Sequence, residues 1–158
     1  MKYQKIILFD IDYTLFNTDV FKQTDLKKHS VYDEVNNVLK ELGKVGILGI
    51  FSEGDLEFQK NKLFRTDIQK HFLKAHMHIT EKKEKILKKV LRKYKDKKVF
   101  LIDDKLSILH LAKTISPSLF AIWVKRGMYA KNQKPIPEFK PDTEVENLKE
   151  IIPIILNS

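Results

Sequence analysis

Apolar residues along the chain fall into two kinds of segment, short continuous runs and stretches with helical spacing. Runs that are mostly apolar and rich in β-branched residues stand at 5–10, 45–51, 77–79, 99–102 and 119–124. Runs of this length, continuous rather than alternating with polar residues, are typical of strands that are buried on both faces. The pattern therefore predicts about five strands.

Between these runs, apolar residues recur every three or four positions, which is the spacing of one helix face. One such stripe predicts a helix over residues 31–42, which Gly43 would end. Further helices are predicted near residues 56–64, 67–72, 86–91, 108–112 and 145–156, with Thr80 as a candidate cap and residues 13–30 irregular. Alternating strands and helices predict an α/β fold, a three-layer Rossmann-like parallel sheet of about five strands with helices on both faces.

Length and composition fit one domain over residues 1–158, and 158 residues suffice for a full hydrophobic core. No apolar stretch approaches the ~20 residues of a membrane helix. The first residues, Met1 with lysines at 2 and 5, lack the pattern of a secretory signal. The absence of cysteine excludes a disulfide framework, a thiolate metal site and a cysteine nucleophile. We expect a cytoplasmic protein without a membrane partner.

The net charge of +9 raises the question of a nucleic-acid partner. Of the 30 basic residues, only Arg65, Arg92 and Arg126 are arginine. Lysine is a hydrated point charge, whereas arginine supplies the forked donor set favoured for phosphate and base recognition. The composition therefore favours solvated lysine faces, and a nucleic-acid surface stays open as the alternative.

Acidic side chains follow two of the predicted strands. Asp10 and Asp12, at i and i+2, leave the first strand on the same side, and Asp103 and Asp104 follow the fourth. The carboxyl ends of parallel strands meet at one edge of the sheet, which is where α/β folds bind ligands. Buried acids there cost free energy unless a cation or a reaction uses them. The alternative interpretation is a solvated strand end.

Hydroxyl and basic groups fall at the same edge. Ser52 and Glu53 end the second strand, and Lys82 and Lys83 open the helix after the third. A hard divalent cation with oxygen ligands would remove the repulsion among the carboxylates. Ser52, backbone N–H groups and a lysine would then suit a phosphoryl group. This reasoning leaves open which aspartate attacks and which lysine takes part.

These positions resemble the four motifs of the haloacid dehalogenase superfamily, in order and at strand ends. The matching residues are Asp10-Ile11-Asp12-Tyr13-Thr14 for the nucleophile motif, Ser52, Lys83 (with Lys82 fitting nearly as well), and Leu101-Ile102-Asp103-Asp104. Each motif alone is unspecific, but four in order across residues 5–104 are a strong signal. Tyr13 departs from the pattern because the family often has glycine there, which affects the shape of the entrance.

The resemblance implies a magnesium-dependent phosphatase that hydrolyses phosphoric monoesters through an aspartyl-phosphate. Asp10 would be the nucleophile and Asp12 the general acid and base. Mg²⁺ would be bound by Asp10, Asp12 through its main-chain carbonyl, Asp103 and Asp104. Ser52, Glu53 and the motif lysine would bind the substrate. Asp12 favours phosphoryl transfer over carbon–halogen chemistry, because dehalogenase members do not use an acid there in this way.

Both gaps between the motifs, residues 15–30 and 53–81, are too short for a separate cap domain, so the resemblance implies a minimal-cap member with an open site. The expected partner is a phosphorylated substrate: a small ester, a nucleic-acid end or a phosphoprotein. Candidate rim contacts are Thr18, Asp19, Lys125 and Arg126. Oligomeric state is not predicted.

Two other functions fit part of this pattern. A signalling receiver domain also phosphorylates an aspartate in an α/β sheet. It places paired acids after the first strand, the phosphorylated aspartate after the third and a lysine after the fifth, whereas here the adjacent acids Asp103 and Asp104 follow the fourth strand. A non-catalytic or weakly catalytic module that binds nucleic acid or protein on the same fold remains the alternative. His76 and His78 share one side of a predicted strand, but no third ligand is close in sequence, so a metal site is not favoured. Trp123 and most of the ten phenylalanines are predicted to be packing residues.

Overall fold

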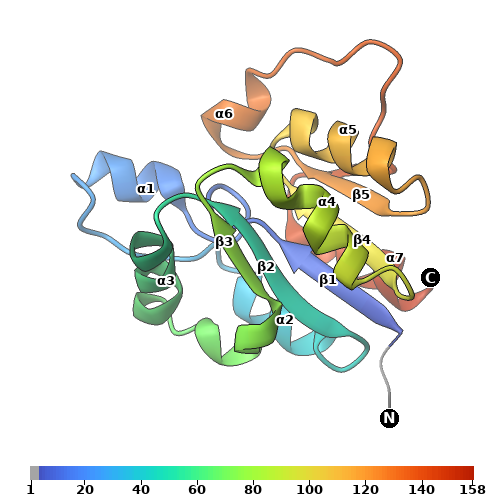
Figure 1. Cartoon of the computed structure of the whole chain (residues 1–158). Helices are drawn as coiled ribbons and strands as arrows, with labels where there is room; N and C mark the ends of the chain where they lie inside the picture. Colours follow the sequence, from blue (N-terminus) through green and yellow to red (C-terminus); the bar gives the residue numbers. More distant parts are fainter. Residues whose placement is uncertain (1–3) are drawn as a thin grey trace.

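One parallel sheet of six strands organises the chain in the computed structural model, which describes residues 4–158 (Figure 1). The first three residues, on which the expectation of no secretory signal partly rests, lie outside the described residues. The strand order is β3-β2-β1-β4-β5-β6. The strands are β1 (Lys5–Phe9), β2 (Ile47–Glu53), β3 (Met77–Thr80), β4 (Lys98–Asp103), β5 (Phe120–Val124) and β6 (Thr143–Val145). The predicted fold class is confirmed, and β6 is an edge strand that the sequence pattern missed.

Helices connect these strands. They are α1 (Thr18–Gln23), α2 (Val35–Leu42), α3 (Leu56–Arg65), α4 (Lys83–Lys93), α5 (Leu106–Ile115), α6 (Gly127–Lys131) and α7 (Ile151–Leu156), with short 3₁₀ turns η1 (Gln69–His71), η2 (Lys74–His76) and η3 (Leu148–Glu150). α1 lies in the stretch that we expected to be irregular. α2 begins at Val35 rather than residue 31, because Val31 forms a bridge with Phe16 instead. Thr80 lies ahead of the N-cap of α4, which is Lys82.

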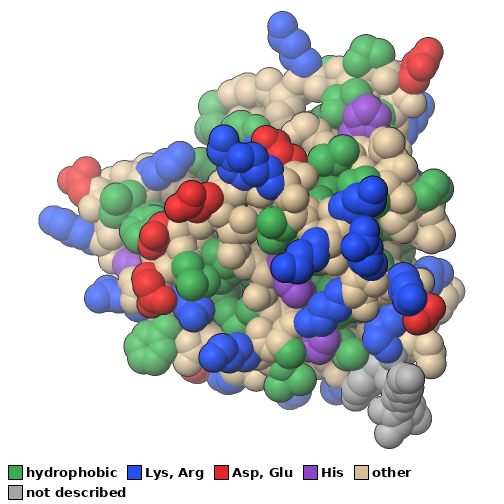
Figure 2. Space-filling model, viewed as in Figure 1, with side chains coloured by type: hydrophobic (Ala, Val, Ile, Leu, Met, Phe, Trp, Pro, Cys, Tyr) green, Lys and Arg blue, Asp and Glu red, His purple; other side chains and the backbone are tan. Residues whose placement is uncertain are grey.

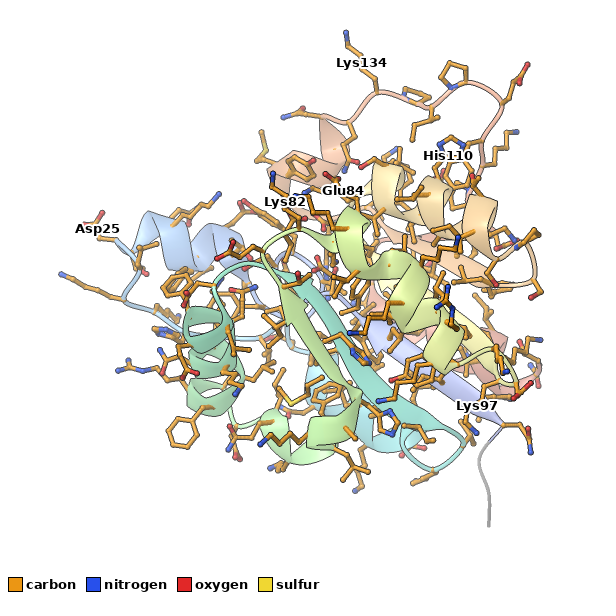
Figure 3. All side chains as sticks on the ribbon, in the orientation of Figure 1. Asp25, Lys82, Glu84, Lys97, His110 and Lys134 are labelled. Carbon is orange, nitrogen blue, oxygen red and sulfur yellow. The ribbon has the colours of Figure 1, made fainter. Side chains whose placement is uncertain are left out.

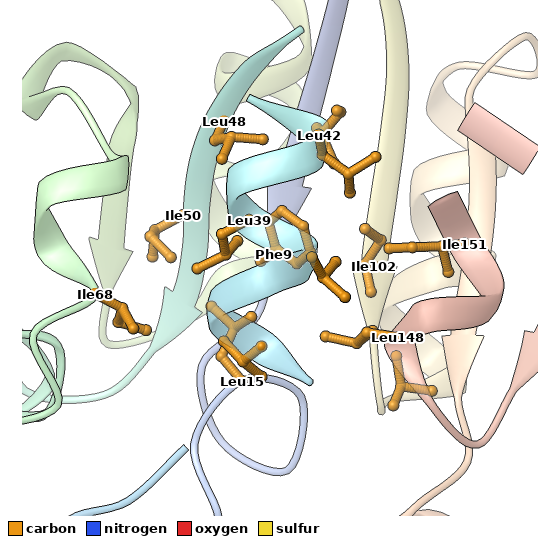
Figure 4. Packing of buried hydrophobic residues seen from close by; sticks show 14 of the residues in the cluster. Phe9, Leu15, Leu39, Leu42, Leu48, Ile50, Ile68, Ile102, Leu148 and Ile151 are labelled. Carbon is orange, nitrogen blue, oxygen red and sulfur yellow. The ribbon is translucent and has the colours of Figure 1, made fainter. Parts of the chain in front are cut away.

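Two hydrophobic cores lie on opposite faces of the sheet. Side chains of β1 alternate between them, so that Ile7 and Phe9 join the core with α2 and α7, whereas Ile6 and Leu8 join the core with α4 and α5. Figure 4 shows the first core, where Leu39 and Leu42 of α2 lie over Phe9 and Ile102 of the sheet. The result is the predicted three-layer arrangement.

The same alternation positions the acidic residues. Asp103 is the last residue of β4 and follows Val99 and Leu101, which face α4 and α5. Asp10 follows Leu8 in the same way, and its backbone N–H donates to the carbonyl of Ile102 at 2.9 Å. Both acids therefore lie next to each other on the side of the sheet where α4 begins.

Helix α3 differs from its prediction. Its apolar residues Leu56 and Phe64 are exposed, while Gln59, Lys62 and Leu63 form the buried face. The polar residues are turned inward because Gln59 and Lys62 donate hydrogen bonds to Asp12, and Gln59 also donates to Ser52 of β2. Hydrophobic periodicity therefore misidentified the inward face of this helix.

His78 lies in β3 and His76 is the last residue of η2, just ahead of that strand. Both contact the hydroxyl of Tyr94, at 2.9 Å for His76 and 2.7 Å for His78. They join no cluster of three or more acidic or histidine ligands among the described residues. Trp123 is buried as predicted. Within residues 4–158, every helix is too short or too polar to cross a membrane.

Candidate active site

Three buried carboxylates meet where β1 and β4 end. Asp10, Asp103 and Asp104 each present an oxygen within 4.8 Å of the others. Phe9 pairs with Ile102 in the sheet, so the residues that follow them are neighbours across the two strands. Asp12, the fourth predicted metal ligand, is absent from this cluster of side chains. Its main-chain carbonyl remains a candidate ligand.

Lys83 provides the positive charge of the cluster. Its Nζ donates to Asp10 Oδ1 at 2.9 Å and to Asp103 Oδ2 at 2.5 Å, and the side chain is 2% exposed. Burial opposes the charged form, but the Asp10 and Asp103 carboxylates outweigh it and raise the pKa of Lys83. Lys82, the other candidate, is exposed at the N-cap of α4 (Figure 3).

One lysine does not balance three buried acids. Burial raises the pKa of Asp104 to about 10, and the Asp10 and Asp103 charges add to the effect. Burial likewise raises the pKa of Asp10 to about 6, although Lys83 opposes this. The cluster thus favours bound protons or a further cation. Buried carboxylate oxygens grouped this closely are the donor set that hard divalent cations such as Mg²⁺ prefer, so the residues fit a magnesium ion.

The loop that carries Asp104 is held by residues far away in sequence. The indole N–H of Trp123 donates to the Asp104 carbonyl at 3.0 Å. Gln133 Nε2 donates to the same carbonyl at 2.5 Å, and Gln133 Oε1 accepts from the Leu106 N–H at 2.8 Å. Gln133 was missed because it lies in an irregular segment without a motif.

Asp12 has a separate set of partners. Its Oδ1 accepts from Lys62 Nζ at 2.8 Å and from the Thr18 hydroxyl at 3.1 Å, and its Oδ2 accepts from Gln59 Nε2 at 3.0 Å. The two aspartates of the first motif therefore differ in environment. Asp10 faces other acids and Lys83, whereas Asp12 is fixed by three donors on α1 and α3.

Lys62 is an unusual buried lysine that sequence analysis did not identify. It is 5% exposed, and its Nζ lies 4.8 to 5.5 Å from the ring centres of Phe16, Phe21 and Phe58. Aromatic faces attract a cation, and the Asp12 carboxylate completes its surroundings. The available signal was the i, i+3 spacing of Gln59 and Lys62 on the helix that follows Ser52.

Ser52 is fully buried behind these groups. Its hydroxyl oxygen accepts from Gln59 Nε2 at 2.8 Å, so Gln59 connects Ser52 with Asp12. Gly54 has a φ of 147°, and a Cβ there would lie 3.0 Å from Gln59 Cγ. Glycine at this position therefore lets α3 bring Gln59 close to the end of β2.

A small cavity of about 200 Å³ opens onto the acids. Asp10, Asp12, Asp103, Asp104 and Lys83 line its floor, and its mouth is formed by Tyr13, Glu53, Lys105 and Tyr129. Lys105 Nζ lies 3.6 Å from Glu53 Oε2, an ion pair across the mouth. The rings of Tyr13 and Tyr129 stack with centres 6.5 Å apart. Glu53, predicted to bind substrate, thus lies at the entrance.

Tyr13 adopts a left-handed backbone conformation, with a φ of 62°. This conformation favours glycine and is uncommon for a residue with a side chain. The Tyr13 N–H donates to the Thr18 hydroxyl at 3.0 Å and to the Phe16 carbonyl at 3.1 Å, and these bonds hold the turn. The ring of Tyr13 occupies one wall of the mouth.

Of the predicted rim contacts, Arg126 is not at the rim. It is 9% exposed, and its Nη1 donates to both carboxylate oxygens of Glu34, at 2.8 and 2.9 Å. Arg126 therefore ties β5 to the start of α2. Thr18 is buried against Asp12, and Lys125 Nζ lies 5.2 Å from the Trp123 ring centre. Asp19 does not line the cavity at the acids.

Comparison with known proteins supports this fold. No protein-family model and no curated protein matches the sequence. Among solved structures, a haloacid dehalogenase-like hydrolase from Burkholderia xenovorans matches with a TM-score of 0.80 and 21% identity over 99% of this chain and 98% of that one. A magnesium-bound hydrolase of the haloacid dehalogenase type from Bacillus subtilis matches with a TM-score of 0.73 and 13% identity over 98% and 99%.

A phosphatase from Clostridium difficile matches with a TM-score of 0.68 and 18% identity over 98% of this chain and 100% of that one. The matching structures also include an L-2-haloacid dehalogenase. The chain therefore has the fold of the haloacid dehalogenase superfamily, and the resemblance seen in the motifs is confirmed at the level of the fold.

Proposed function

We propose that the protein is a magnesium-dependent phosphatase that hydrolyses phosphoric monoesters through an aspartyl-phosphate on Asp10. The observation that carries the proposal is the buried cluster of Asp10, Asp103, Asp104 and Lys83 at the strand ends. Unlike a solvated strand end, this cluster is buried and has too few positive charges for its acids. A bound cation, together with an attacking carboxylate that faces the cavity, explains both properties.

Magnesium would be held by Asp10, Asp103 and Asp104, with the main-chain carbonyl of Asp12 as a further ligand. When bound, the ion supplies positive charge that offsets the charge of the phosphoryl group. The oxygen-only donor set supports Mg²⁺ over zinc, which favours nitrogen and sulfur ligands. The magnesium-bound structural neighbour agrees with this choice.

Asp10 is the proposed nucleophile because its carboxylate lines the cavity floor beside Lys83. Its oxygen attacks phosphorus, and the bond to the ester oxygen breaks as that oxygen takes a proton from Asp12. Water then gives a proton to Asp12 and releases phosphate from Asp10. Lys83 stays protonated throughout, because its pKa is raised, and it orients Asp10 while countering the charge of the transferring group.

Asp12 distinguishes this reaction from dehalogenation. Both reactions begin with attack by an aspartate, but only the alkoxide that leaves in ester hydrolysis needs a proton. Asp12 lines the same cavity as Asp10 and lies outside the cluster of buried acids, which suits a proton carrier. We therefore expect hydrolysis of phosphate esters and no release of halide from 2-haloacids.

The test is magnesium-dependent release of phosphate from para-nitrophenyl phosphate. We expect turnover with Mg²⁺, loss of turnover after chelation, and recovery when Mg²⁺ is restored, because the acids repel one another and the phosphate without it. The same preparation is assayed for halide release from 2-chloropropionate. A protein that releases halide but no phosphate, or neither product with any divalent ion, would contradict the proposal.

Replacing Lys62 with methionine tests the role proposed for Asp12. We expect kcat to fall by about 10- to 100-fold with a small change in KM, because a misplaced proton carrier slows the chemical step without weakening substrate binding. Lys60→Met, on the same helix but outside the site, is the matched control. For an aryl ester with a better leaving group, the fall in kcat should be smaller, because the leaving oxygen depends less on protonation by Asp12. An equal loss for both esters would show that Lys62 is merely structural.

A further inference from the structure

The positive charge of the chain is concentrated in one place. Residues 82–98, which form α4, the turn after it and the start of β4, hold ten of the 30 lysines and arginines and two of the 21 acids. The remainder of the chain is almost balanced, with 20 basic and 19 acidic residues. Nearly all of the net charge of +9 therefore belongs to this segment.

Most of these cations lie on the surface. Apart from Lys83 in the active site and the half-buried Lys97, they are exposed, and together we call them the α4 basic face: Lys82, Lys85, Lys88, Lys89, Arg92, Lys93, Lys95 and Lys98. Figure 2 shows basic side chains gathered over α4 and the turn that follows it. None of the eight forms an ion pair with a carboxylate in the described part of the chain.

This arrangement works against the helix that carries it. Lys85 and Lys89, Lys88 and Arg92, and Lys89 and Lys93 are each four residues apart, a spacing at which like charges destabilise a helix. An ordinary solvated face mixes acids with lysines and avoids this repulsion. A bound polyanion would remove it, so the pattern is that of a binding surface.

The chemistry of the face selects a nucleic acid over a membrane. Leu87, Val90 and Leu91 of α4 are buried in the core and Ile86 is partly buried against it, so α4 presents no fully exposed large apolar side chain that could insert into lipid. Lysines track regularly spaced phosphates as point charges, without the fork that reads bases. The surface therefore fits a sugar–phosphate backbone bound without regard to sequence.

One end of the α4 basic face adjoins the active site. Lys82 lies at the N-terminal end of α4 beside Lys83, and Lys97 lies beyond its other end (Figure 3). Eleven helical residues span roughly 16 Å, enough for several successive phosphates. At the N-terminal end, the cavity of about 200 Å³ admits a single phosphate group but not a duplex, and the 45% exposed ring of Tyr129 offers a stacking surface for one base.

We propose that the α4 basic face binds the backbone of a single-stranded nucleic acid and leads a terminal phosphate of that strand to Asp10. The binding part of this inference is independent of the chemistry, whereas the assignment of the terminal phosphate as substrate rests on the proposed function. The strand contacts the lysines through phosphates, and the reaction removes only the monoester at its end.

Two variants that lose the same number of positive charges test the binding part of the inference. One variant carries Lys85→Gln, Lys88→Gln, Lys89→Gln and Arg92→Gln, and glutamine preserves helix propensity. The control carries Lys27→Gln, Lys28→Gln, Lys134→Gln and Lys140→Gln, four exposed residues outside α4. Binding of a fluorescent single strand of about 12 nucleotides, with a phosphate on its 5′ or its 3′ end, is measured by anisotropy.

For four phosphate contacts, we expect the wild-type association constant to fall about fiftyfold between 50 and 200 mM salt. The α4 variant should bind at least about tenfold more weakly at low salt with a flatter salt dependence, and the control should bind like wild type. Equal binding by wild type and the α4 variant, or an equal loss in the control, would overturn the proposal. So would equally tight binding of polyglutamate or of phosphatidylserine vesicles.

Activity separates this inference from the proposed function. The α4 variant should lose at least about tenfold in kcat/KM on the phosphorylated strand and keep its kcat/KM on para-nitrophenyl phosphate, because the replaced residues lie outside the cavity. Hydrolysis of the small ester without binding of the strand would refute the inference and leave the phosphatase intact. Binding of the strand that depends on α4, without hydrolysis of either substrate, would refute the phosphatase and the terminal-phosphate assignment and leave the binding surface intact.

Discussion

Asparagine in place of Asp10 is expected to abolish phosphate release, with kcat reduced by at least about four orders of magnitude. The change removes the oxygen charge that attacks phosphorus but keeps the shape of the side chain and an acceptor for Lys83. Because three buried acids share one lysine, loss of one charge also relieves repulsion. We therefore expect the free energy of unfolding without magnesium to be unchanged or slightly higher.

The measurements are steady-state kinetics with para-nitrophenyl phosphate and urea denaturation of both proteins. Asp33→Asn, an exposed residue ahead of α2, is the matched control and should retain wild-type activity and stability. Wild-type turnover by the Asp10 variant would transfer the nucleophile role to another residue. An inactive variant that is also unfolded would be followed by Asp10→Ser, which is smaller and carries no charge.

Replacing Lys83 with methionine is expected to have the second large effect. Methionine matches the length of the lysine but leaves Asp10 and Asp103 buried without their partner, and breaking a buried pair in this way costs about 3–5 kcal/mol of stability. Phosphate release should fall about 10²- to 10³-fold, the scale for loss of one charged donor at a transition state. Magnesium should restore part of the stability, because it binds the folded acids and supplies positive charge.

The neighbouring Lys82→Met provides a matched control. Lys82 is exposed at the start of the same helix, so its replacement should change stability by no more than about 0.5 kcal/mol and leave turnover of a small ester intact. Urea denaturation with and without Mg²⁺ gives the stabilities of both variants. A larger loss in the Lys82 variant than in the Lys83 variant would contradict the site as we describe it.

Sequence patterns were sufficient for the central strands and their acidic ends. β1 and β4 are continuous apolar runs that stop at aspartates, and parallel pairing then requires Asp10 and Asp103 to meet. Shorter elements gave weaker signals. β6 has three residues, of which only Val145 is buried, and no periodicity is visible over such a length.

Residues that support the site were harder to predict because they depart from the usual pattern of a core. The inward face of α3 carries Gln59 and Lys62. Leu56 and Phe64, which the hydrophobic pattern assigns to the buried face, are exposed. Polar groups on a buried face are expected at functional sites, because there the residues are set by the reaction rather than by the usual preference for apolar residues in the core. Helix α1 has a signal in the sequence, because Asn17 is a favoured cap residue, and in the structure its side chain accepts from the Val20 N–H.

The close approach of Tyr13 and Gly127 has an evolutionary consequence. Gly127 has a φ of 80°, and a Cβ at this position would lie 2.5 Å from a ring carbon of Tyr13. The ring of Tyr13 therefore fills the space that a side chain at position 127 would need, although the two residues are more than a hundred positions apart in sequence. Homologous chains that have a side chain in place of Gly127 should carry a residue without a ring in place of Tyr13, so the two alignment columns should covary.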